Sequence, residues 1–157
     1  MSQISFTISG LMQSYGDTTY SAYRTTYDHP TKSAIIGMIA AALGYQRNEQ
    51  AKIAQLSQSL HFSYYTIQPG SQTCDYQNVH YTNFKSKKST YLPGYFGKTL
   101  KQTWRDYLQD AKFGIVLTGD HDLLKKIEYA LKHPIFVLYL GRKSYPLDRP
   151  LDIIFKD

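Results

Sequence analysis

Residues 69–111 interrupt an otherwise regular succession of helical and extended segments, and this interruption constrains the fold more than any other feature of the sequence. Apolar residues at every second position, or in short continuous runs, predict strands, and apolar residues three and four positions apart predict helices. On these patterns the predicted strands are residues 3–9, 61–68, 112–118 and 135–140, and the predicted helices are residues 31–43, 48–60 and 122–132.

Local signals refine the predicted helices. Thr31, Asn48 and Asp120 are residue types that cap helix starts, so each is expected to open the helix that follows it. Gly37, within a run rich in alanine and isoleucine, predicts close packing of the first helix on a sheet. The last predicted strand is almost wholly apolar, which is typical of an interior strand.

Without residues 69–111, the predicted elements follow the order βαββαβ, with one short additional helix in the first crossover. This order predicts an α+β fold with a ferredoxin-like core, the arrangement also found in the RNA-recognition motif. We expect residues 1–157 to form a single domain, in which residues 69–111 are a thumb-like insertion between the second and third strands of that core. A hairpin turn would suffice there, and a connection this long is usually functional.

The composition excludes several classes of protein. Cys74 is the single cysteine, so the chain has neither an internal disulfide framework nor a multi-cysteine zinc site. No Walker, HExxH or Gly-x-Ser-x-Gly motif is present, and we predict no cofactor, no metal and no catalytic residue. The start of the chain does not resemble a secretory signal, and the longest apolar stretch, residues 34–45, is too short to span a bilayer. These features predict a cytoplasmic protein without a membrane partner.

The charge of the chain favours a polyanionic partner. The formal net charge is +6, and half of it lies in residues 69–111, where six Lys and Arg stand against three Asp. Aromatic residues are interleaved with these cations, a combination that suits single-stranded nucleic acid because cations follow phosphates and rings stack on bases. The candidate RNA-binding residues of this stretch are Tyr76, Lys85, Lys87, Lys88, Trp104 and Arg105. The alternative is a solvated hairpin whose rings pack on the domain.

Three further segments carry candidate anion-binding residues. They are the turn after the first strand, the start of the first helix with an arginine upstream of it, and the loop after the last predicted strand. An ordinary turn, plain helix capping and a basic surface loop are the respective alternatives. The candidate residues are Gln13, Ser14, Tyr15 and Gly16 in the turn, Arg24, Lys32 and Ser33 near the helix start, and Gly141, Arg142 and Lys143 in the loop.

Several short blocks, in matching order and spacing, resemble the CasD family of subunits of type I-E CRISPR Cascade. The blocks are residues 10–16, 24–26, 30–33, 36–37, 42–44, 46–47, 75–76, 102–108, 110–113 and 138–147. The resemblance covers nearly the whole chain. Familiar members continue well beyond residues 141–144, so this chain corresponds to a short form of the family.

The resemblance implies a RAMP-superfamily protein with a ferredoxin-like core and a protruding thumb, which residues 69–111 would form. Family members bind the 5′ handle of the CRISPR RNA (crRNA) within an antiviral ribonucleoprotein and cap one end of its backbone filament. The implied partners are the crRNA handle, a CasC-type backbone subunit and a CasA-type large subunit, with target DNA reached only through the complex. In the type I-E branch a separate subunit cuts the precursor RNA, so the resemblance implies binding without cleavage.

Two alternative functions remain open at this stage. One is a metal-independent endoribonuclease like the type I-C branch of the family, which uses Tyr, Lys and His. His80 is the candidate acid or base here, although Lys87-Lys88 is not followed by a histidine, which argues against this function. The other alternative is a protein-interaction domain with the same fold and no nucleic-acid ligand.

Overall fold

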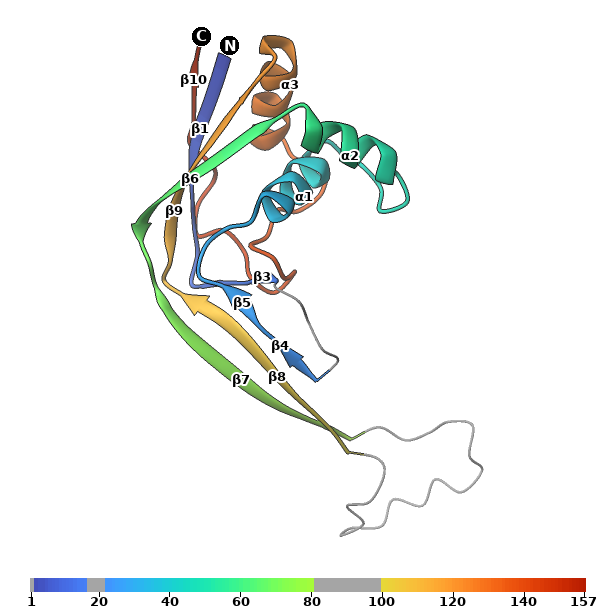
Figure 1. The fold of residues 1–157 in the computed structure, drawn as a ribbon, viewed down its shortest axis with the longest axis vertical. Coiled ribbons are helices and arrows are strands. Elements are labelled where there is room, and N and C mark those ends of the chain that lie inside the picture. The colour runs from blue at the N-terminus through green and yellow to red at the C-terminus, as the bar shows by residue number, and fades with distance from the viewer. Residues whose placement is uncertain (1, 17–21, 81–99) are drawn as a thin grey trace.

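The computed structural model describes residues 2–16, 22–80 and 100–157. Its main sheet contains β1 (Ser2–Ser9), β6 (His61–Gln68), β9 (Lys112–Gly119) and β10 (Ile153–Lys156). The strands lie in the order β10-β1-β9-β6, and every neighbouring pair is antiparallel. Figure 1 shows the helices α1 (Lys32–Ala42), α2 (Gln50–Gln58) and α3 (His121–Lys132) on one side of this sheet. The described chain is therefore a mixed α and β structure with antiparallel sheets.

The hydrophobic core lies between the main sheet and the helices. Alternate residues of a strand face the same side, so Ile4 and Ile8 of β1 and Ile115 of β9 are all fully buried toward the helices. The helices contribute fully buried apolar side chains in return, namely Ile35 and Ile39 from α1 and Leu124 and Ile127 from α3. The period of two in residues 3–9 thus predicts the buried face of β1 correctly.

Side-chain caps fix the starts of two helices. The Oγ1 atom of Thr31 accepts a hydrogen bond from the N–H of Ala34, and the Oδ2 atom of Asp120 accepts one from the N–H of Leu123. Both caps confirm the sequence prediction. Asn48 does not cap α2, because that helix begins later, with Glu49 at the cap position and no side-chain cap bond. Within the described residues, none of the helices has the length and apolar character needed to cross a membrane.

The insertion between β6 and β9 forms a long two-stranded ribbon that runs away from the main sheet (Figure 1). It consists of β7 (Ser71–His80) and β8 (Leu100–Gln109), paired antiparallel along their lengths. The ribbon lies between the end of β6 at Gln68 and the start of β9 at Lys112. Gly70 and Asp110 both have positive φ values, 73° and 55°, so both strands change direction where the ribbon leaves the sheet.

Four very short strands lie between β1 and α1, and two of them pair with the ribbon. β2 (Met12–Gln13) pairs antiparallel with β8, and β4 (Tyr23–Arg24) pairs parallel with it. β3 (Tyr15–Gly16) and β5 (Thr26–Tyr27) pair with each other. β2 and β4 therefore lie beside β8 and hold the described part of the ribbon against the body.

The predicted strand at residues 135–140 is wrong. The N–H groups of Ile135 and Phe136 donate to the carbonyls of Ala42 and Ala41, so this segment satisfies backbone acceptors at the end of α1 instead of joining the sheet. The side chain of Val137 is 82% exposed, unlike that of an interior strand residue. The edge position beside β1 is taken by β10, at residues for which no strand was predicted.

We expect Asp120→Ala to lower the free energy of unfolding by about 1 kcal/mol, because it removes the acceptor that caps α3. Asp120→Asn keeps a capping oxygen and is the matched control, for which we expect little change. Chemical denaturation followed by circular dichroism measures both. Equal losses in the two variants would contradict a capping role for this side chain.

Candidate nucleic-acid interface

A groove of about 1060 Å³ lies between α1 and the segment that follows α3, and it brings together three of the sequence-predicted sites. Its lining includes Ser14 and Gly16 from the turn after β1, Ser33 from the start of α1, and Gly141 and Lys143 from the loop after α3. These segments are distant in the chain, so their meeting could not be predicted from spacing.

The groove is electrostatically one-sided. Among the described residues that line it there are two cations, Arg47 and Lys143, and no Asp or Glu. Tyr45, Phe136 and Tyr139 add aromatic rings to the same lining. Two cations without carboxylates, next to rings and hydroxyls, suit a ligand that carries both phosphates and flat bases.

Sequence reasoning did not select Tyr45 and Arg47 as site residues. The signal in the sequence that could have identified them is Gly44, a glycine just after the predicted helix. Its φ of 79° ends α1, and the residues that follow it enter the lining of the groove. Gly37 was interpreted incorrectly, because it does not pack on the sheet. It is exposed, lines the groove, and has open space where a side chain would begin.

One close backbone contact shapes the groove. The N–H of Ser14 donates to the carbonyl of Leu140 at 3.0 Å, which joins the turn after β1 to the loop after α3. Gly141 follows with a φ of 91°, and a Cβ atom there would lie 1.7 Å from the carbonyl oxygen of Ser14. Only glycine is compatible with this approach.

Three predicted binding residues of the turn are buried. Gln13 is fully buried, where its Nε2 atom donates to the carbonyl of Ala111 and its Oε1 atom accepts from the hydroxyl of Tyr15 at 2.6 Å. Tyr15 is 1% exposed, and burial raises the pKa of its hydroxyl above the ordinary value. Ser14 is also buried, and its hydroxyl donates to the carbonyl of Asp106 at 3.4 Å. These side chains hold the turn in place, and Gly16 is the exposed residue of the turn in the groove lining.

Two predicted cations are engaged with protein groups. The ammonium of Lys32 donates to the carbonyl of Leu60, just beyond α2, at 2.9 Å. The guanidinium of Arg142 donates from Nη1 to the hydroxyl of Tyr145 at 2.8 Å and from Nη2 to the carbonyl of Asp106 at 3.0 Å. Arg142 therefore ties the groove loop to β8, so the groove and the ribbon are mechanically connected.

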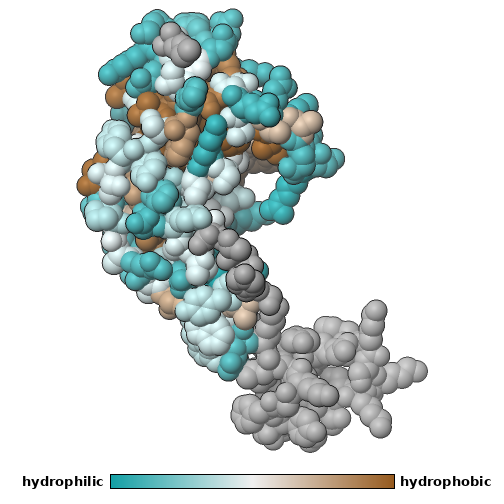
Figure 2. All heavy atoms as spheres, viewed as in Figure 1, coloured by the Kyte–Doolittle hydropathy of each residue, from teal (hydrophilic) through white to brown (hydrophobic). Residues whose placement is uncertain are grey.

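Three aromatic rings cluster where β4 meets the ribbon, and two of them are stacked. The ring of Trp104 lies 5.7 Å from that of Tyr23, nearly parallel to it, and 5.3 Å from that of Tyr76. Tyr23 and Tyr76 are about half exposed, at 47% and 52%, so each keeps ring surface for a ligand. In the view of Figure 2 the described part of the ribbon is mostly white to teal with isolated tan atoms, while more brown surface lies over the upper body.

The other predicted ribbon residues fall into two groups. Arg105 lies on β8 beside Arg24 of β4, as the register of these strands records. The lysine cluster at Lys85, Lys87 and Lys88 lies outside the described residues, so its part in the interface stays a prediction.

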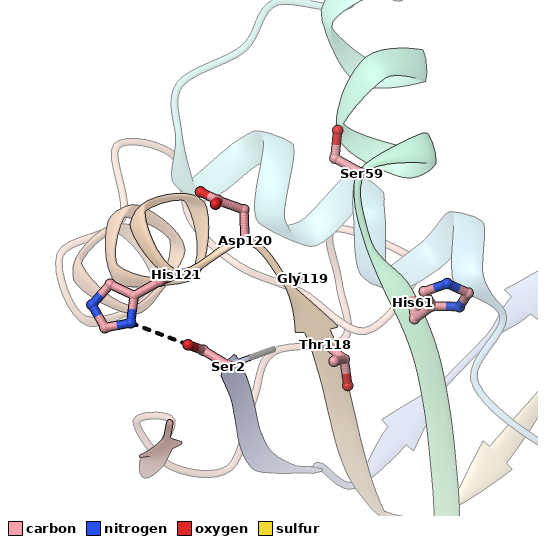
Figure 3. A pocket seen from close by; sticks show the side chains of 7 residues that line it. All are labelled: Ser2, Ser59, His61, Thr118, Gly119, Asp120 and His121. Atoms are coloured by element: carbon pink, nitrogen blue, oxygen red, sulfur yellow. Dashed lines mark hydrogen bonds between the residues drawn. The ribbon is translucent and has the colours of Figure 1, made fainter.

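A second, smaller pocket of about 470 Å³ lies at the opposite end of the main sheet, where β9 meets α3 (Figure 3). Ser2, His121 and Asp157 meet beside it in a combination that resembles a catalytic triad. The Nδ1 atom of His121, however, lies 3.1 Å from the Ser2 hydroxyl and 2.9 Å from the Asp157 carboxylate. A triad needs a different ring nitrogen for each partner, so this arrangement does not activate Ser2.

No group of three potential metal ligands occurs in the described parts of the chain.

We expect Gly141→Ala to destabilise the protein by roughly 2 kcal/mol or more, because the added methyl group meets the Ser14 carbonyl in a left-handed backbone conformation. Gly37→Ala is the matched control. Its methyl group enters open space on α1, so we expect a gain of about 0.5–1 kcal/mol. Thermal and urea unfolding measure both variants, and a neutral Gly141→Ala would contradict the close contact.

Comparison with known proteins relates the chain to CRISPR-associated proteins. CRISPR system Cascade subunit CasD of Escherichia coli (strain K12) is 32% identical over 152 residues, which cover 92% of this chain and 66% of that protein. The chain thus spans slightly less than two thirds of this relative.

Solved structures agree with this relationship. A chain of a CRISPR RNA-guided surveillance complex is similar with a TM-score of 0.73 and 29% identity, and a Cas protein crystal structure with 0.65 and 31%. Each match covers 95% of this chain and 61% of the other. A chain of the type III-B Cmr-beta complex bound to cognate target RNA shares the fold, with a TM-score of 0.57, 14% identity, and coverage of 98% of this chain and 60% of that one.

The family whose description is CRISPR-associated protein (Cas_Cas5) matches residues 4–154, and the chain belongs to this family.

Proposed function

We propose that this chain is a crRNA-binding subunit of a type I-E Cascade complex that grips the 5′ handle of the crRNA and does not cut it. The observation that carries the proposal is the groove, in which three distant segments bring Lys143 and Arg47 together without any carboxylate in the lining. The similarity to CasD supports the same function.

The proposed architecture is a ferredoxin-like core with a thumb. The strand order β10-β1-β9-β6 supports it, because in chain order these are the fourth, first, third and second strands of the main sheet. Helices connect the first strand to the second and the third to the fourth, as the βαββαβ order requires. In this proposal the ribbon of β7 and β8 is the thumb.

Each surface has a distinct role in the proposed complex. Ser33, Arg47 and Lys143 bind phosphates in the groove, and the ring stack of Tyr23, Trp104 and Tyr76 holds bases on the ribbon. The buried or engaged residues, namely Gln13, Tyr15, Lys32 and Arg142, position these surfaces. Affinity then comes mainly from phosphates, and discrimination from the splayed bases.

The proposed partners follow from the family. They are a CasC-type backbone subunit, whose filament this chain would cap, and a CasA-type large subunit, with target DNA contacted only through the complex. Membership of the Cas5 family and likeness to a chain of a surveillance complex support a place in such an assembly. Co-purification of the tagged chain with crRNA and these subunits tests the assignment directly.

We expect Lys143→Gln and Arg47→Gln each to weaken binding of a labelled single-stranded repeat RNA roughly tenfold, because one charge-assisted phosphate contact contributes about 1.5 kcal/mol. Lys126→Gln, which removes an exposed cation of α3 away from the groove, is the charge-matched control and leaves the affinity unchanged. Fluorescence anisotropy at several salt concentrations measures the effect.

Three results would contradict the proposed function. Equal losses in all three variants would indicate a nonspecific effect of net charge and not a groove site. Specific cleavage of the repeat RNA without added metal, abolished by His80→Ala, would favour the endoribonuclease over a binding protein. An RNA affinity that does not change with salt would favour the protein-interaction alternative, since phosphate contacts weaken as salt rises.

A further inference from the structure

Two arginines face each other across neighbouring strands of the ribbon sheet. β4 and β8 pair in parallel, and their register places Arg24 directly beside Arg105. Like charges in this position repel each other, so the pair is unfavourable unless a group of opposite charge lies between the guanidiniums.

No carboxylate of the described residues forms an ion pair with either guanidinium. Asp75 is opposite Arg105 across the β7–β8 register, but its carboxylate interacts with the hydroxyl of Tyr107. Burial first, and then this carboxylate, raise the pKa of Tyr107. Asp106 follows Arg105 on β8 and therefore points to the opposite face, where it accepts a hydrogen bond from Gln72.

Two buried hydrogen-bonding atoms without partners lie on the Arg105 face of β8. They are the Nε atom of Arg105 and the hydroxyl oxygen of Thr103. Thr103 is two residues from Arg105 on β8 and so shares its face. Thr103 is only 8% exposed. Buried polar atoms are normally paired, so two unpaired groups that can donate indicate an acceptor-rich ligand.

We propose that Arg24 and Arg105 together bind one phosphate group at the β4–β8 seam, with the Thr103 hydroxyl as an additional donor. A phosphate has the charge that separates the two guanidiniums and enough acceptor oxygens for the unpaired donors. The inference deepens the proposed function, on which it rests, by naming this phosphate as a phosphodiester of the bound RNA. A free phosphate ion has the same chemistry, and the experiment separates the two sources.

The phosphate site is separable from the ring stack. Trp104 precedes Arg105, so its side chain lies on the opposite face of β8, where it stacks with Tyr23. A Trp104→Ala variant therefore removes base stacking and leaves both arginines in place. This separation lets mutation distinguish a phosphate contact from a general effect on the ribbon.

The first arm of the experiment measures RNA affinity against salt for Arg24→Gln, Arg105→Gln and the double variant of the full chain. If both arginines hold one phosphate, each single variant loses affinity roughly fivefold to tenfold, and the double variant lowers the salt slope by about 0.7 in total, the value for one phosphate of a single strand. Arg149→Gln, an exposed arginine beside Asp148, is the matched control. The proposal is overturned if the salt slope of the double variant falls by about 1.4, the value for two phosphates, or if the variants lose no RNA affinity.

The second arm uses inorganic phosphate alone and needs no RNA. We expect phosphate to raise the Tm of the unaltered protein and of Trp104→Ala above that in chloride at equal ionic strength, and this increase to disappear in the double arginine variant. The double variant Arg24→Lys with Arg105→Lys keeps both charges but lacks the planar guanidinium groups. If it folds normally and still loses the phosphate-dependent increase in Tm, the loss reflects the geometry of the guanidiniums and not misfolding.

The two arms distinguish failure of this inference from failure of the proposed function. RNA binding that is unaffected in the arginine variants, without a Tm response to phosphate, overturns the phosphate site and leaves the proposed function standing. A Tm response to phosphate in a protein that binds no RNA supports the site and removes the proposed function. A loss of RNA affinity without a response to free phosphate assigns the site to the RNA-borne phosphodiester.

Discussion

The arrangement of both candidate binding surfaces depends on the contact between Gly141 and Ser14. The loop after α3 can reach the turn after β1 only because Gly141 has no side chain, since a Cβ atom there would overlap the Ser14 carbonyl. That contact places Lys143 in the groove, and it places Arg142 where its guanidinium reaches the Asp106 carbonyl of β8. One backbone approach therefore fixes the groove and also its connection to the ribbon.

The ribbon, in turn, depends on what lies along β8. A two-stranded ribbon alone has marginal stability in water. Here β2 and β4 pair with the edge of β8 that faces away from β7, and the ring of Trp104 stacks on Tyr23 of β4 and contacts the tilted ring of Tyr76 on β7. The described part of the ribbon is consequently held in a defined direction from the sheet, with its direction changed at Gly70 and Asp110. Rings on such a support lose less freedom on binding than rings on a free loop.

Local signals predicted most of the fold but little of the site. The strand at residues 61–68 and the caps at Thr31 and Asp120 follow from periodicity and turn chemistry, which are local. The apolar run at residues 135–140 predicted an interior strand, which is wrong because the hydrogen-bond partners of Ile135 and Phe136 belong to α1. Gln13, Lys32 and Arg142 are of a type that suits anion binding, yet their partners are distant residues that no spacing rule identifies.

The distribution of carboxylates argues more strongly for a nucleic-acid ligand than the net charge does. Glu128 pairs with Lys125 and Lys132 of its own helix. Glu49 lies next to the groove, where it pairs with Lys52 and accepts a hydrogen bond from the N–H of Gln46. Nearby lysines therefore neutralise both carboxylates. Unpaired cations that are merely solvated, such as Lys126, need no ligand. The cations of the groove and of the β4–β8 seam differ, because in the described structure they lie beside aromatic rings or unpaired buried donors. A polyanion with flat bases can pair with these cations and donors and can also stack on the rings, whereas an acidic protein surface would only neutralise the charge.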